Sequence, residues 1–191
     1  MKLTTLFSLP LMAVLAGGCA DTQQTAPKRA VARPYGAVTL ASIKLYTPEP
    51  IFAERLPDVS VFSDYLKTIV ADADAYCAPL PHREPQTAEL VVALKPSGRS
   101  RFWCEFSSGV FPQERVRELE LRLARLPTPS VRHGPVAALL HLSVFGGTNE
   151  ARIKQADGSM YVPKQWRDAA SKEAGQTVTV PDGILDLVWP E

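Results

Sequence analysis

The sequence is short of histidine, cysteine and net charge, and each shortage excludes a class of function. It has three histidines, three cysteines, 21 basic and 20 acidic side chains in 191 residues. No CxxC pair and no HExxH motif is present, so the spacings typical of metal sites are missing. A near-neutral chain without a large Lys/Arg cluster lacks the electrostatic footprint of a nucleic-acid-binding protein. We therefore expect no metal, no cofactor and no nucleic-acid partner.

Catalytic motifs are also missing. The sequence contains no GxSxG elbow, no SxxK and no glycine loop of the kind that cradles phosphate. Catalytic residues can be scattered along a chain, so a hydrolase-like envelope enzyme with a site around His141 or His133 stays as an alternative. A single histidine in an apolar strand is most often a packed residue, and we expect the chain not to be an enzyme.

The first 18 residues have the features of a signal peptide. Lys2 supplies a basic start, residues 3–16 form a short apolar run that contains Pro10, and the small residues Ala16-Gly17-Gly18 precede Cys19. An apolar run of this length is too short for a stable membrane span. The pattern predicts export through a cleaved signal.

The stretch Leu15-Ala16-Gly17-Gly18-Cys19 resembles a bacterial lipobox, in which cleavage exposes a cysteine that is then acylated, for example with palmitate. Ala16 stands where a large aliphatic residue is preferred, so an ordinary signal peptide with Cys19 as a bystander is the alternative. Residues 19–36 are predicted to form the lipidated N-terminus and a flexible tether of about 17 residues, spanning roughly 20–25 Å. Ala20 is not the aspartate that favours inner-membrane retention, so we expect the outer membrane, facing the periplasm.

Residues 37–191 are predicted to form one small α+β domain, with an antiparallel sheet packed against two main helices. Apolar periodicity of 3.6 indicates helices, and period-2 alternation indicates strands. Proline, glycine and asparagine or aspartate clusters mark the turns between them. The predicted elements are a strand at 38–46, a helix at 61–77 capped by Ser60, a hairpin at 88–106, a helix at 113–126, a central strand at 136–145, a turn at 156–158, a helix at 163–174 and a second hairpin at 176–191.

After Cys19 only Cys77 and Cys104 remain. Two cysteines in an exported chain favour a disulfide, which would close a loop of about 28 residues and stabilise the fold by roughly 3–4 kcal/mol. The alternative, a metal pair, has no further ligand at a usual spacing. Cys104 shares a face of its predicted strand with Phe102 and Phe106, and a helix ending at Cys77 can pack on that face.

The segment from about residue 61 to 145 resembles the C-terminal domains of the TonB and TolA proteins. The resemblance rests on the order helix, hairpin, helix, strand and on the stretches ELVVALKPSGRSRFWCEFSSG and LARLPTPSVRHGPVAALLHLSVF. It implies a small α+β domain that binds periplasmic proteins through a sheet edge or a helix surface, with a disulfide like that of TolA-type domains. Those proteins have a transmembrane helix and a long spacer, whereas this chain has a cleavable signal and a short tether. Their energy-transducing role is therefore not expected here.

Together these features predict a bacterial envelope lipoprotein that is held to the membrane by its N-terminal lipid and binds another envelope protein or component. A second alternative to this prediction, besides the hydrolase, is a structural or assembly protein that acts by oligomerisation through the final hairpin.

Overall fold

The computed structural model describes residues 36–81, 83–108, 111–148, 160–173 and 178–190. Contacts divide the chain into two units, Met1–Ala32 and Arg33–Glu191, and every described residue belongs to the second. The predicted signal peptide, Cys19, nearly all of the tether and the turn at 156–158 lie outside the described residues. Within these ranges, no helix combines the length and the apolar character needed to cross a membrane.

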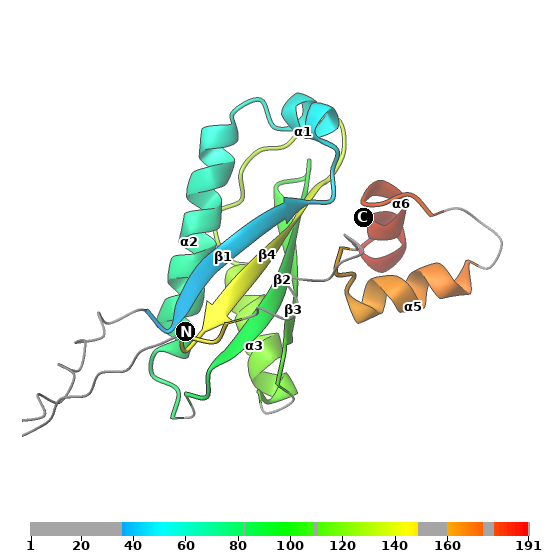
Figure 1. Ribbon diagram of the computed structural model, residues 1–191. Helices are drawn as coiled ribbons and strands as arrows, with labels where there is room; N and C mark the ends of the chain where they lie inside the picture. The colour runs from blue at the N-terminus through cyan, green and yellow to red at the C-terminus, as the bar shows by residue number, and fades with distance from the viewer. Residues whose placement is uncertain (1–35, 82, 109–110, 149–159, 174–177, 191) are drawn as a thin grey trace, which may run out of the picture. The chain divides into compact units, whose positions relative to one another are not determined.

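A four-stranded antiparallel sheet forms the centre of the fold, with the strand order β1-β4-β2-β3 (Figure 1). β4 pairs with β1 on one side and with β2 on the other, which confirms the central strand predicted from its continuous apolar run. β1 and β3 are the two edges. The strands are β1 (Val38–Leu45), β2 (Gln86–Lys95), β3 (Arg99–Phe106) and β4 (Val136–Val144).

The predicted hairpin is present as β2 and β3, paired from Lys95↔Arg99 to Ala88↔Phe106. Gly98 has a φ of 72°, and its N–H donates to the Lys95 carbonyl at 3.0 Å. A residue with a side chain is strained at such a φ, so glycine suits this position of the turn.

Helices cover both faces of the sheet (Figure 1). α1, α2 and α3 pack on one face, and α5 and α6 pack on the other. The antiparallel sheet and its two main helices, α2 and α3, confirm the predicted α+β class. The helices are α1 (Glu49–Arg55), α2 (Val59–Cys77), α3 (Gln113–Leu123), α5 (Lys164–Lys172) and α6 (Asp182–Val188).

α2 begins two residues before the predicted start. Asp58, not Ser60, is the N-cap, and its carboxylate accepts a hydrogen bond from the Ser60 N–H at 2.9 Å. An aspartate at this position satisfies a donor that the first turn would otherwise leave unpaired. The expected cap at Ser60 was therefore wrong, while the end of the helix at Cys77 is as predicted.

Two apolar cores lie on opposite faces of the sheet, because alternate residues of β2 point to opposite sides. Leu90 and Val92 belong to the first core, which α2 and α3 cover. Val91 and Ala93 belong to the second core, which is centred on the fully buried Trp166 of α5. A core on each face explains why every residue of β2 is buried.

The predicted C-terminal hairpin was wrong, because α6 occupies the middle of that segment. Ile184 and Leu185 of α6 are buried in the second core, and Val188 packs against it. Val188 follows Leu185 by three residues and Ile184 by four, so the three side chains share one helical face, as a helix on an apolar sheet requires. The helix turns all three side chains toward the second core, whereas an isolated hairpin would place Leu185 on the opposite face from Ile184 and Val188.

Candidate functional site

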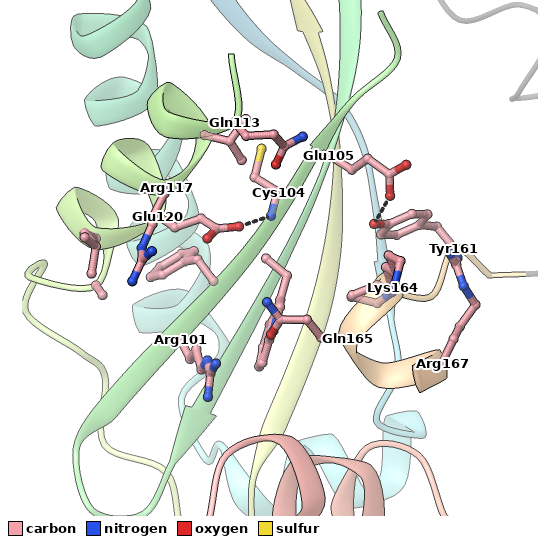
Figure 2. Close-up of a pocket in the computed structure, with 16 residues that line it drawn as sticks. Arg101, Cys104, Glu105, Gln113, Arg117, Glu120, Tyr161, Lys164, Gln165 and Arg167 are labelled. Atoms are coloured by element: carbon pink, nitrogen blue, oxygen red, sulfur yellow. Dashed lines mark hydrogen bonds between the residues drawn. The ribbon is translucent and has the colours of Figure 1, made fainter. Parts of the chain in front are cut away.

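A groove of about 840 Å³ runs along the β3 edge of the sheet (Figure 2). Five consecutive residues of β3, Arg101–Glu105, line it. Their side chains alternate between the two faces, so the groove follows the edge of the strand rather than one face of the sheet. α3 forms one wall, and Tyr161 with the start of α5 forms the other. The wall residues are Gln113, Val116, Arg117, Glu120, Leu121 and Ala124 on one side and Tyr161, Pro163, Lys164, Gln165 and Arg167 on the other.

The β3 edge directs main-chain polar groups into this groove. The Ser107 N–H donates to the Thr87 carbonyl at 2.8 Å, which sets the side of the chain that faces β2. In an antiparallel pair the alternate residues turn their N–H and C=O groups away from the neighbouring strand. By this alternation the main-chain N–H and C=O groups of Phe102, Cys104 and Phe106 point away from β2, while their side chains pack with the first core.

The outward N–H of Cys104 is held by a side chain rather than by a strand. It donates to Oε1 of Glu120 at 2.7 Å, and Figure 2 shows this carboxylate reaching across from α3. Burial raises the pKa of Glu120, while the hydrogen bond from Cys104 and the charges of Arg101 and Arg117 act to lower it. Glu120 is thus a carboxylate aimed at an exposed strand edge.

The opposite wall is fixed by two side-chain hydrogen bonds to β3. The Tyr161 hydroxyl donates to Oε2 of Glu105 at 2.6 Å (Figure 2), and Nε1 of Trp103 donates to Oε1 of Gln165 at 3.0 Å. Burial raises the pKa of Tyr161 well above its ordinary value, and the hydrogen bond to Glu105 adds to the shift. The hydroxyl is therefore protonated, and available as a donor, at neutral pH.

The sequence placed Cys77 and Cys104 near each other, and in the structure both pack with the first core, with no disulfide drawn between them. Burial raises the pKa of Cys77 to about 11 and that of Cys104 well above its usual range. Cys104 also lines the groove through β3. The disulfide between them stays a prediction.

His141 meets a carboxylate, as a catalytic histidine would. Its Nδ1 lies 2.6 Å from Oε2 of Glu89, its partner across β2 and β4. It does not line the groove, and the nearby Ser143 hydroxyl donates to the Gly147 carbonyl instead. His133 sits in the loop before β4 with a φ of 57°. The structure therefore brings His141 to an acid but does not join it to a nucleophile among the described residues.

Metal ligands do not cluster: within the described ranges no three His, Cys, Asp or Glu side chains are placed to share an ion. The groove itself was missed by the sequence reasoning. Glu120 stands in no motif, and the α5 wall is brought to β3 by contacts between distant segments. The only usable signal was the alternation of β3, which placed Cys104 on the face where the helix ending at Cys77 packs.

Comparison of the chain with family models, with curated proteins and with solved structures finds no match. The likeness to TonB and TolA domains thus rests on the order of elements and the quoted stretches alone.

Proposed function

We propose that this chain is a lipoprotein of a Gram-negative cell envelope whose α+β domain binds another envelope protein along the β3 edge. The observation that carries the proposal is the groove beside an edge strand with outward main-chain groups. An extended segment of a partner can add to such an edge, gaining main-chain hydrogen bonds from the strand and side-chain contacts from the walls.

The dimensions of the groove suit this mode of binding. Five residues of strand extend over roughly 16 Å at about 3.3 Å per residue, and strands of three to ten residues are the usual length in sheets. The two walls rise from opposite faces of the sheet, so they would contact the alternating side chains of an added strand on both sides. A flat sheet edge without walls would offer main-chain hydrogen bonds alone.

The predicted lipid at Cys19 would hold the domain close to a membrane. With a tether of about 17 residues, the domain would stay within a few nanometres of the membrane surface. Partners would therefore be proteins in or next to that membrane. We favour the periplasmic face of the outer membrane.

Photo-crosslinking in living cells tests the binding site. A benzoylphenylalanine at Leu121, which is 55% exposed and lines the groove, should give an adduct with another envelope protein. The matched control is Val61, which is 47% exposed on α2 and does not line the groove. Adducts from both positions, or from neither, would contradict binding at the β3 edge.

Cell fractionation tests the anchor separately. A Cys19→Ala variant should move from the membrane to the soluble periplasmic fraction, because it lacks the acceptor of the lipid. Labelled palmitate should enter the parent protein and not the variant. Full retention of the variant in the membrane fraction would contradict the lipid anchor without bearing on the groove.

The hydrolase alternative gains one observation, the contact between His141 and Glu89. A hydrolase also needs a nucleophile within hydrogen-bond reach of the histidine and a cavity for substrate. The groove contains neither His141 nor His133. The oligomerisation alternative relied on a final hairpin, where α6 is found instead. Binding at the β3 edge is therefore the better supported function.

A further inference from the structure

Glu120 occupies the position on β3 where a neighbouring strand would place a carbonyl oxygen. Its Oε1 accepts the outward N–H of Cys104 at 2.7 Å. In a sheet, that N–H would donate to the main chain of the next strand. A charged side chain directed at a free edge is a device that prevents indiscriminate strand pairing. Glu120 therefore acts as an internal competitor for any strand that adds to β3.

Cations outnumber acids in the groove, although the chain as a whole is almost neutral. Both acidic side chains already accept hydrogen bonds, one from Cys104 and one from Tyr161. A ligand would thus meet an excess of positive charge. The cations are Arg101, Arg117, Lys164 and Arg167, and the acids are Glu105 and Glu120.

The two walls differ in character. Lys164 and Arg167 come from α5, and Arg101 points to the same side of β3 because it pairs with Ala93, a residue of the second core. Lys164 is paired with Asp168 in an exposed contact, and exposed ion pairs of this kind add little stability. Exchanging that partner for a ligand carboxylate therefore costs little.

The α3 wall is more apolar. Val116 and Leu121 line it beside the cationic Arg117. An added strand points successive side chains to opposite sides, so one set would meet the cations of α5 and the other the apolar residues of α3. The walls together fit a strand in which acidic and apolar residues alternate.

We propose that the partner of the β3 edge is an extended protein segment with alternating acidic and apolar side chains, and that it displaces Glu120 when it binds. The inference rests on the proposed function, since it names the chemistry of the same site. The main-chain carbonyl of the segment takes the Cys104 N–H, and its carboxylates meet Arg101, Lys164 and Arg167.

Two peptides test this chemistry on the full-length protein in detergent. One alternates glutamate with valine over seven residues, and the other has lysine in place of each glutamate. Both carry an uncharged fluorophore for fluorescence anisotropy. The glutamate peptide should bind and the lysine peptide should not, because only the first complements the cations.

Two charge reversals make the test specific. Lys164→Glu should weaken binding of the glutamate peptide about tenfold or more, which corresponds to about 1.4 kcal/mol. The control is Arg125→Glu, an identical charge change just beyond α3 that lies outside the groove, and it should leave the affinity within about twofold. Equal losses from both variants, or equal binding of the two peptides, would overturn the inference.

Glu120→Ala tests the displacement. The variant lacks the competitor for the Cys104 N–H, so the glutamate peptide should bind severalfold more tightly, and amide exchange at Cys104 should slow on binding. Unchanged or weaker binding by a folded variant would overturn the role of Glu120. A Leu121 adduct with a partner segment that lacks acidic residues would refute this inference alone, whereas the absence of any adduct would refute the proposed function.

Discussion

The guanidinium of Arg55 donates two hydrogen bonds to the carboxylate of Asp182, at 2.6 and 2.7 Å, and the two residues are 127 positions apart in the sequence. Arg55 also donates to the Pro135 carbonyl at 2.7 Å. It ends α1 and Asp182 begins α6, so one side chain ties together elements from opposite ends of the domain. The hydrogen bond to Asp182 raises the pKa of Arg55 further, so the guanidinium stays charged.

Removing the Arg55 side chain should destabilise the protein. Arg55 is 11% exposed and Asp182 44%, so Arg55→Ala should lower the free energy of unfolding in urea by about 1–3 kcal/mol. The control is Arg115→Ala, which breaks a more exposed pair with Glu118 and should lower the free energy of unfolding far less. Equal losses would mean that the Arg55 link does not stabilise α6.

A close approach of two main-chain segments requires glycine at position 147. A Cβ there would lie 2.1 Å from the carbonyl oxygen of Gln86, at the start of β2. Gly147→Ala should therefore displace the end of β2 and lower the melting temperature, with a loss of about 2–3 kcal/mol.

Gly98→Ala is the comparison for that substitution. Gly98 has a positive φ of 72°, but its Cβ would meet nothing within 4 Å. Only the conformational cost of about 1–2 kcal/mol applies there. A larger loss at Gly98 than at Gly147 would show that the contact with Gln86 relaxes easily.

Local patterns were enough to predict the centre of the fold. The alternation along β2 and β3 and the Pro96-Ser97-Gly98 turn are properties of neighbouring residues, and the structure has the same hairpin. α1 was not predicted, because Pro48 and Pro50 follow the predicted strand at 38–46 and prolines commonly mark the end of a strand. In the structure they start a helix, where proline's fixed φ and missing N–H are tolerated.

The C-terminal segment and the groove could not be predicted in this way. The alternation of threonine and valine before Pro181 favours a hairpin locally, yet the burial of Ile184 and Leu185 against the sheet decides for a helix. Likewise, the carboxylate of Glu120 acquires its role only when α3 meets β3. These features depend on which distant surfaces meet, and neighbouring residues do not encode that.

The state of the two core cysteines can be measured directly. We predict that mature protein extracted from the envelope, denatured without reductant, has no alkylatable thiol at Cys77 or Cys104. Reduction should then lower the free energy of unfolding by roughly 3–4 kcal/mol, the loss expected for a loop of about 28 residues.

Two reactive thiols would refute the disulfide, and a second measurement then follows from their burial. The pKa of Cys77 is raised to about 11, so the folded protein at pH 7 would contain almost no thiolate. Alkylation would then be slow in the native protein and fast in urea. Fast alkylation of the native state would contradict the buried position of Cys77.

Stability should depend on pH through Glu120 with a particular sign. Its pKa is raised by burial above the ordinary 4.5, so the unfolded state ionises first as the pH rises. The native state loses stability as the pH rises from 4.5 through the folded pKa. Glu120→Gln cannot ionise but keeps an acceptor for Cys104. Its stability relative to the parent should therefore rise across that window and then level off.

Glu118→Gln should behave in the opposite way, which makes it the control. Hydrogen bonds from Tyr76 and Arg115 lower the pKa of Glu118, so the parent keeps its stabilising contribution above pH 4.5 and loses it as the pH falls through the lower, folded pKa. Urea unfolding between pH 3 and 7 gives the difference in free energy of unfolding between each variant and the parent. Every other group titrates alike in all three proteins. If the free energy of unfolding of Glu120→Gln, relative to the parent, falls as the pH rises, then the hydrogen bond from Cys104 affects the pKa of Glu120 more than burial does.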